Sequence, residues 1–167
     1  MKKLKKKFKK KSSLNELSNF VNFRFKKTYF VPDSVFKLLI KKIKSKMICA
    51  RENHAVAMAF GGKLIDKKCL IMMQNSGLGL SIDSLIGTFD LYNEGCVIFL
   101  SNRGKLDWEE VQHKKWGVVT RPIIKSLNFK FYNFNNEGML AVKKAYKYAF
   151  SKNKIVIVLF ERGNIDE

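Results

Sequence analysis

The sequence predicts an α/β domain with three layers, in which a mainly parallel central sheet is flanked by helices. Short apolar runs rich in Val, Ile and Leu, such as residues 95–101 and 154–160, alternate along the chain with longer amphipathic segments. Strands that are apolar throughout belong to sheets covered on both faces, and a helix between two strands allows them to run parallel. The length of 167 residues fits one domain of this kind.

The expected elements alternate along the chain. Strands are predicted at residues 27–31, 46–51, 68–73, 95–101, 129–134 and 154–160. Helices are predicted at residues 14–23, 34–44, 52–65, about 78–89, from 107 onward and 138–151. Pro32 ends the first strand because proline has no backbone N–H. Asp107 is expected to cap its helix because Glu110 follows at the spacing of a capping box, and a glycine-containing loop is expected after residue 73.

Basic residues dominate the charge balance. The chain has 33 Lys and Arg against 14 Asp and Glu, a net charge of +19, and eight lysines lie in residues 1–11. We expect residues 1–13 to be a disordered Lys-rich tail, because like charges repel, and residues 14–167 to be the folded domain. Nucleic-acid binding would need Arg and stacking aromatic side chains on one face. The charge here is mostly Lys, so we do not expect nucleic acid as a partner.

The cysteines and the apolar runs indicate a reduced, non-membrane environment. Cys49, Cys69 and Cys96 lie inside apolar runs without metal-ligand spacing, and their number is odd. They are therefore predicted to be buried free thiols rather than a disulfide framework, and no metal site is expected in this chain. No apolar run reaches the roughly 18 residues needed to cross a bilayer. We expect no membrane association and a cytoplasmic location.

Polar side chains follow several of the predicted strands. Asp33 follows the first strand, Glu52 the second, and Gln74, Asn75 and Ser76 the third. Because the carboxyl ends of parallel strands meet at one end of a sheet, where such folds bind ligands, these side chains are expected to converge. Each also has a purely structural interpretation. Asp33 suits a helix cap, Glu52 suits the first turn of a helix, and residues 74–76 suit a turn.

Five segments together resemble a known family. VPDS at 31–34, REN at 51–53, MQNSGLG at 73–79, SNRG at 101–104 and EEVQH at 109–113 occur in one order. Their sequence and order resemble the N-terminal half of phosphonopyruvate decarboxylase and the α subunit of sulfopyruvate decarboxylase, both thiamine-diphosphate enzymes. The resemblance covers about residues 26–125. It implies the thiamine-diphosphate-binding fold, in its pyrimidine-type domain.

The resemblance also implies roles for individual residues. Glu52 would hydrogen-bond to the aminopyrimidine ring nitrogen of thiamine diphosphate and promote deprotonation of the thiazolium carbon. The catalytic residues that face the substrate would be Asp33, Gln112 and His113. The cofactor pocket would be lined by Gln74, Asn75, Ser76 and Gly77.

The resemblance further implies a split enzyme that is active only with a partner. The family's diphosphate- and Mg²⁺-binding domain has no counterpart in the sequence, so a β subunit would supply it and Mg²⁺, in an α2β2 or larger hetero-oligomer. The substrate would be an anionic 2-oxoacid of the phosphonopyruvate or sulfopyruvate type. Candidates for binding its anionic tail are Arg51, Arg103 and Arg121.

Three departures from the family pattern leave the chemistry open. The family's Asn residues are replaced by Leu80 and Asp83, and its Pro in the EPQH segment by Val111. The substrate, and a carboligating rather than decarboxylating reaction, therefore stay open. A non-catalytic basic domain that binds nucleic acid or an acidic partner is a further alternative.

Overall fold

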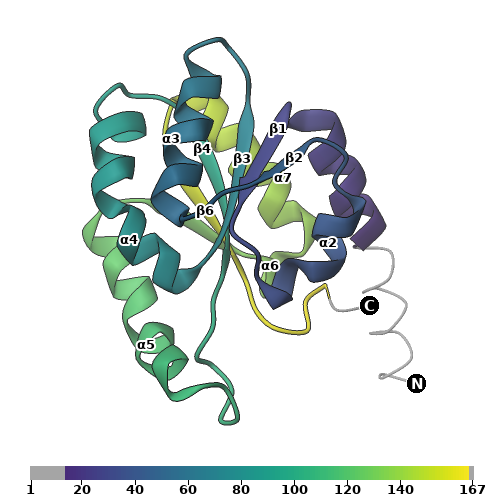
Figure 1. The fold of residues 1–167 in the computed structure, drawn as a ribbon, viewed down its shortest axis with the longest axis vertical. Helices are drawn as coiled ribbons and strands as arrows, with labels where there is room; N and C mark the ends of the chain where they lie inside the picture. Colours follow the sequence, from purple (N-terminus) through teal and green to yellow (C-terminus); the bar gives the residue numbers. More distant parts are fainter. Residues whose placement is uncertain (1–13, 166–167) are drawn as a thin grey trace.

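A six-stranded, entirely parallel sheet forms the centre of the molecule. The computed structural model describes residues 14–165. The strands are β1 (Lys27–Phe30), β2 (Lys46–Ile48), β3 (Cys69–Gln74), β4 (Cys96–Ser101), β5 (Lys130–Asn133) and β6 (Ile155–Phe160). Their order in the sheet is β2-β1-β3-β4-β6-β5, and every neighbouring pair is parallel (Figure 1).

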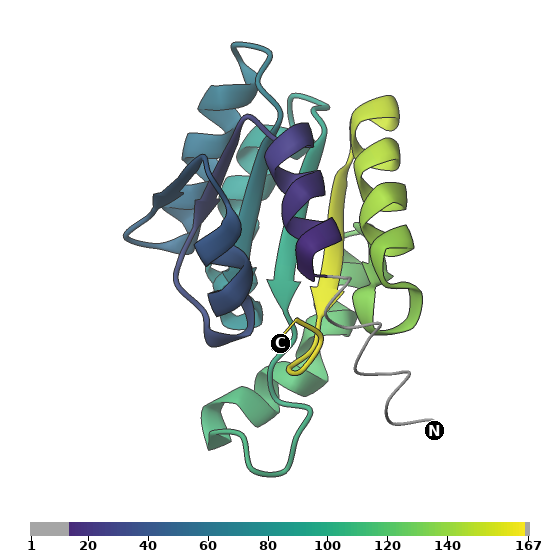
Figure 2. The same ribbon diagram turned by 90° about the vertical axis from the view of Figure 1, so that its right-hand side faces the viewer.

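Helices cover both faces of this sheet (Figure 2). Residues 14–24 are helical. The other helical segments are η1 (Ser34–Phe36), α2 (Lys37–Lys42), α3 (Glu52–Lys63), α4 (Asn75–Leu85), the π-helical turn η2 (Ile86–Asp90), α5 (Val111–Ser126), α6 (Phe134–Glu137) and α7 (Met139–Lys152).

The core consists of two apolar layers, one on each face. Successive β3 residues alternate between them, because side chains along a strand point to opposite faces. Leu70 and Met72 pack on one face with the helix at 14–24, α2 and α7. Ile71 and Met73 pack on the other face with α3, α4 and α5. The predicted fold, three layers around a parallel sheet, is thus confirmed.

At the carboxyl end of the sheet, the order of the strands produces a switch point between β1 and β3, which we call the crevice. The chain leaves β1 through α2 on one face and leaves β3 through α4 on the other. Since β1 and β3 are neighbours, the segments that follow them separate. Open parallel sheets bind ligands at such a point.

Two local predictions were wrong. The helix expected from Asp107 begins at Val111, because Glu109 holds the preceding backbone in a tight turn instead. The loop expected after residue 73 is the first turn of α4, which begins at Asn75 directly after β3. The glycines that suggested a loop are helical, and neighbouring side chains occupy the space that a Cβ would take.

The three cysteines are buried and free, as predicted. Cys69 and Cys96 lie in strands, whereas Cys49 directly follows β2. Burial raises the pKa of each thiol above its ordinary value, which disfavours the reactive thiolate.

The sequence also predicted no membrane association and a Lys-rich tail at residues 1–13. Within residues 14–165, no helix has both the length and the apolar composition that a membrane span requires. The tail predicted at residues 1–13 lies outside the described residues.

Candidate active site at the carboxyl end of the sheet

Glu52 is the first residue of α3, the helix that follows β2. A carboxylate is favoured there by the partial positive charge of the helix N-terminus. The half-buried side chain lies against α4, since a Cβ at Gly77 would overlap Glu52 Cγ and would be only 2.7 Å from Oε1. Among residues 14–165 the carboxylate has no hydrogen-bond or ion-pair partner. Gly77 therefore provides the space for an acidic group that nothing in the described chain neutralises.

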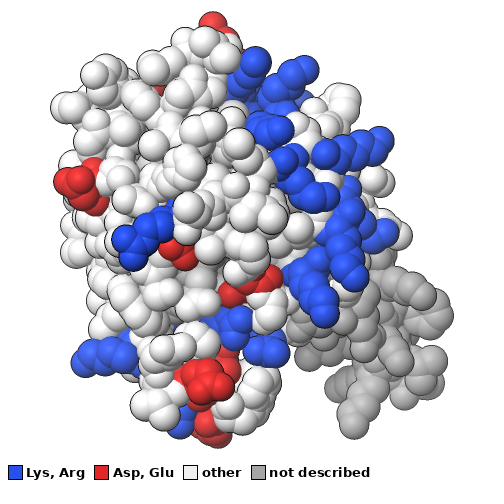
Figure 3. Space-filling view, in the orientation of Figure 1, with Lys and Arg blue, Asp and Glu red and all other residues white. Residues whose placement is uncertain are grey.

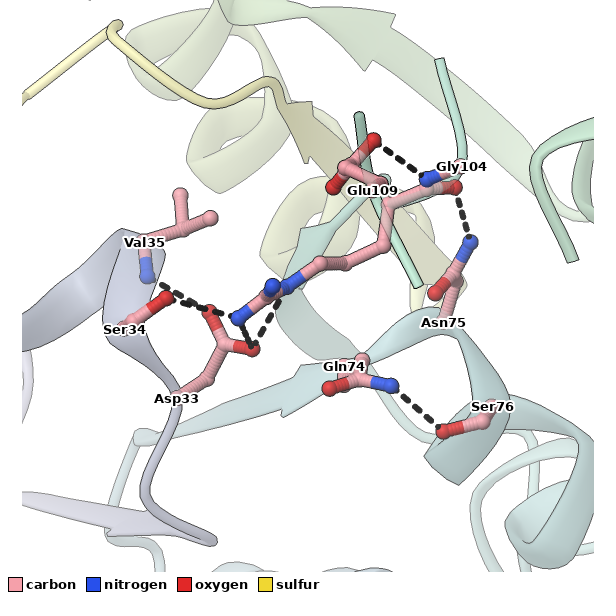
Figure 4. A network of polar contacts seen from close by, with 9 residues as sticks. Asp33, Ser34, Val35, Gln74, Asn75, Ser76, Gly104 and Glu109 are labelled. Carbon is pink, nitrogen blue, oxygen red and sulfur yellow. Dashed lines mark hydrogen bonds and ion pairs between the residues drawn. The ribbon is translucent and has the colours of Figure 1, made fainter. Parts of the chain in front are cut away.

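Asp33 lies in the loop after β1, where its two oxygens have different partners (Figure 4). Oδ1 accepts a hydrogen bond of 2.8 Å from the Val35 N–H and so caps η1. Oδ2 accepts hydrogen bonds from Arg103 Nε at 3.3 Å and Nη2 at 3.2 Å. The same Nη2 also donates to Ser34 Oγ at 2.7 Å. The Asp33 side chain is only 2% exposed, so this ion pair joins the β1 and β4 loops in a largely dry setting.

Gln74 ends β3, and Asn75 and Ser76 begin α4 on the other side of the crevice. Gln74 Nε2 donates to Ser76 Oγ at 3.0 Å, and both side chains are partly exposed. Asn75 is fully buried, and its Nδ2 donates to the Arg103 carbonyl and to Thr120 Oγ1, each at 3.0 Å. In this chain the Asn75 Nδ2 thus joins the β4 loop to α5, while its Oδ1 has no hydrogen-bond partner among residues 14–165.

Glu109 organises the loop between β4 and α5. Its Oε2 accepts hydrogen bonds from the backbone N–H groups of Gly104, Lys105 and Leu106, at 2.8 to 3.1 Å. Burial raises the pKa of this carboxyl. The N–H donors and the nearby Arg103 guanidinium oppose burial and together hold the pKa below its ordinary value. The sequence contained this glutamate in the EEVQH segment, but no local signal showed that it folds back onto the preceding residues.

His113 and Gln112 lie in the first turn of α5 and differ in exposure. The Gln112 side chain is exposed, whereas His113 is buried and its Nδ1 has no hydrogen-bond partner among residues 14–165. The β4 loop approaches this turn closely, because a Cβ on Gly104 would be in severe overlap with the His113 carbonyl oxygen. Gly104 also has a φ of +86°, which favours glycine.

The three candidate arginines lie in different places. Arg103 lies in the crevice, where it binds Asp33. Arg121 lies on α5, where Nη2 donates to Asn133 Oδ1 at 3.0 Å and lies 3.9 Å from Glu161. Arg51 is exposed directly before α3 and forms no ion pair with any described residue.

The three residues that depart from the family pattern have exposed side chains. Leu80 and Asp83 lie on α4, and Val111 is the first residue of α5. They are thus not part of the core.

The segments at the carboxyl end of the sheet accordingly carry an unpaired carboxylate, an ion pair and a buried imidazole, groups suited to holding and moving protons. No cluster of three or more His, Cys, Asp or Glu side chains that could hold a metal ion occurs within the described part of the chain.

Comparisons with known proteins identify both sequence relatives and similar folds. No protein-family model matches the chain. The sulfopyruvate decarboxylase subunit alpha of Methanocaldococcus jannaschii is 32% identical over 138 residues, which cover 78% of this chain and 82% of that protein. The corresponding subunit of Methanococcus maripaludis is 24% identical over 113 residues, covering 66% of this chain and 68% of the relative.

Two solved structures share the fold at low sequence identity. The 2-oxoglutarate:ferredoxin oxidoreductase of Magnetococcus marinus has a TM-score of 0.68 and 12% identity, over 92% of this chain and 29% of that one. An enzyme of Mycobacterium smegmatis assigned to the thiamin-diphosphate-dependent class has a TM-score of 0.64 and 15% identity, over 93% and 30% of the two chains.

Proposed function

We propose, since this chain belongs to the family of sulfopyruvate decarboxylase alpha subunits, that it is the α subunit of a split thiamine-diphosphate-dependent 2-oxoacid decarboxylase. In this proposal residues 14–167 are its pyrimidine-binding domain. The observation that carries the proposal is the position of Glu52, half-buried against Gly77 and without a partner among the described residues.

The residues around Glu52 fit the aminopyrimidine of thiamine diphosphate. A Cβ at Gly77 would overlap the Glu52 side chain, so the chain keeps this position free for the carboxyl group. When bound, thiamine diphosphate supplies the nucleophilic carbon and the electron sink for loss of carbon dioxide from a 2-oxoacid. The part of Glu52 is to hold a proton at its carboxyl oxygen against the pyrimidine ring nitrogen. Gln74, Ser76 and Gly77 would line the same pocket.

The proposed substrate-facing residues are Asp33, Gln112 and His113. The Arg103 ion pair and the Val35 N–H fix the direction of the Asp33 carboxylate. The unpartnered Nδ1 of His113 is available for a proton or a hydrogen bond once the site is complete. We assign Asn75 a positioning role, because its buried amide holds the Arg103 backbone.

A β subunit would complete the site with the diphosphate- and Mg²⁺-binding domain, in a hetero-oligomer such as α2β2. Glu52 lies on α3 against the first turn of α4, and the loops at this end of the sheet come from a single domain. Protein sites for small molecules bury most of the ligand surface. A second protein surface is therefore required to cover the cofactor.

We propose sulfopyruvate as the substrate, with phosphonopyruvate as the second candidate because its tail is also a tetrahedral anion. Of the three candidate arginines, Arg51 is the one that forms no ion pair with a described residue, and it directly precedes Glu52. It is therefore our candidate for binding the anionic tail.

The test is co-expression with the β subunit and measurement of carbon dioxide release from a panel of 2-oxoacids, with thiamine diphosphate and Mg²⁺ added. We expect turnover of sulfopyruvate, and a loss of about 100-fold or more in the Glu52→Gln variant. The matched control is Glu137→Gln, which removes a half-buried charge paired with Lys144 at a distance from the proposed site. If Glu52→Gln assembles and keeps near-normal turnover, the assignment of Glu52 is wrong.

A further inference from the structure

A second pocket lies at the amino end of the sheet, opposite the candidate active site. It has a volume of about 600 Å³ and is lined by the segments that precede three strands, at residues 21–26, 43–45 and 66–68. Because the sheet is parallel, a strand length of roughly 15–20 Å separates this pocket from the carboxyl end. The proposed decarboxylase chemistry does not use it.

The charge around this pocket is strongly unbalanced. Its lining includes five basic residues, namely Arg24, Lys26, Lys44, Lys67 and Lys68, and one acidic residue, Asp66. None of the five forms an ion pair with a described residue, and the Asp66 carboxylate lies 4.0 Å from Lys63 Nζ. Figure 3 shows the wider setting, with Lys and Arg gathered over the right-hand part of the molecule and few charges over α3 and α4. Several cations around one pocket, none of them in an ion pair with a described residue, attract an anion.

Local contacts hold two of these cations in place. The Lys68 ammonium lies 5.4 Å from the ring centroid of Tyr146 and 5.2 Å from that of Phe150. The Arg24 guanidinium lies 5.5 Å from the Tyr146 centroid. Cation–π contacts of this kind fix a charged group without neutralising it.

Hydrogen bonds to backbone groups join the three segments that form the pocket. Asn22 donates from Nδ2 to the Lys42 carbonyl at 3.0 Å and accepts from the Lys44 N–H at 2.8 Å. The Lys26 N–H donates to the Lys68 carbonyl at 2.8 Å. The pocket is therefore a formed feature of the fold rather than a gap between independent loops.

An exposed aromatic ring lies beside the cations. Phe23 lines the pocket, is 80% exposed, and has the Arg24 guanidinium 5.1 Å from its ring centroid. Such a ring offers a flat apolar surface on which a nucleobase can stack. The pocket volume lies within the range of sites for small molecules.

We propose that this pocket binds a free nucleoside di- or triphosphate, with its phosphates near the lysines and its base against Phe23. A single exposed ring beside one pocket fits one nucleotide, whereas a nucleic-acid strand requires successive stacking rings along a groove. The proposal stands independently of the decarboxylase assignment.

The test is isothermal titration calorimetry of the full chain with ATP at a physiological salt concentration. We expect saturable binding of one ATP per chain. The double substitution Lys44→Ala with Lys67→Ala should raise the Kd about tenfold or more, because it removes two charged donors. The control is Lys114→Ala with Lys115→Ala, which removes the same charge from the exposed surface of α5 and should leave the Kd within about twofold.

A second variant isolates the contribution of the base. Phe23→Ala should raise the Kd for ATP at least about fivefold and leave the Kd for inorganic triphosphate unchanged. The proposal is overturned by absence of saturable ATP binding at millimolar concentration, by equal weakening in both double variants, or by equal Phe23→Ala effects on the two ligands. It is also overturned if single-stranded RNA binds tightly while ATP does not. None of these outcomes bears on Glu52, since no 2-oxoacid is present.

Discussion

At the carboxyl end of the sheet the buried charges of Asp33 and Glu109 have polar partners, whereas the cations around the amino-end pocket form no ion pair with a described residue. Asp33 is paired with Arg103, and Glu109 accepts three backbone hydrogen bonds. The carboxylate of Glu52 is the exception at the carboxyl end. The difference indicates that the two kinds of charged group have different roles. Paired groups shape the loops, and unpaired groups are those left for a ligand.

The ion pair between Asp33 and Arg103 should have the largest effect on stability. Asp33→Asn leaves a cap for η1 but removes the countercharge of Arg103, whose side chain is 12% exposed. Removing one partner of a buried pair costs about 3–5 kcal/mol. We expect a loss of this size in the free energy of unfolding, measured by urea denaturation.

The matched control for that pair is Arg121→Gln. Its 3.9 Å contact with Glu161 is made by side chains that are 42% and 29% exposed. Exposed pairs contribute roughly 0–1 kcal/mol. Equal losses in the two variants would show that burial does not distinguish these pairs.

The contact between Gly77 and Glu52 should have the next largest effect, on activity rather than on folding. Gly77→Ala places a methyl group where the Glu52 side chain now lies and forces the carboxylate to move. A misplaced catalytic group costs on the order of 100-fold in rate. Stability should not fall in proportion, since Ala is favoured over Gly in a helix by about 1 kcal/mol. The measurement is turnover by the assembled complex alongside thermal unfolding.

Gly87→Ala is the control on the adjoining π-helical turn, because nothing lies within 4 Å of a Cβ there. Its turnover should equal that of the unsubstituted protein. Full activity in Gly77→Ala would show that the close contact does not position Glu52.

The smallest expected effect is that of Glu109, and it depends on pH. Since the pKa of its carboxyl is lowered in the fold, the stabilisation is present above the ordinary carboxyl pKa and is lost as the pH falls through the lowered value. Glu109→Gln should cost roughly 1–3 kcal/mol at neutral pH. The difference from the unsubstituted protein should shrink in acid. Urea denaturation at several pH values measures it, and a pH-independent difference would contradict an ionic role.

The sequence was sufficient for the architecture because the central strands β3, β4 and β6 are six-residue, mostly apolar runs and amphipathic segments separate them. The segments around Asp33, Glu52 and His113 were expected to converge for a topological reason, since each follows the carboxyl end of a strand or the loop after it. That expectation needs no side-chain detail. The fold and the location of the candidate site were therefore predictable.

Side-chain partners were not predictable in the same way. Asp33 and Arg103 are 70 residues apart, and no local pattern pairs them. Asn75 was expected in the cofactor pocket, but the sequence did not indicate that its Nδ2 donates to the Arg103 carbonyl and to Thr120, 45 residues away. The turn made by Glu109 displaced the predicted cap at Asp107. In each case the deciding contact comes from tertiary packing.

The most direct test of the central claim is the rate of hydrogen–deuterium exchange at the thiazolium carbon of thiamine diphosphate bound to the assembled α and β subunits. If Glu52 promotes that deprotonation, the Glu52→Gln complex should bind the cofactor, and its exchange rate should be lower by a factor of about 100 or more. Equal exchange rates in the two complexes, with equal cofactor occupancy, would contradict it.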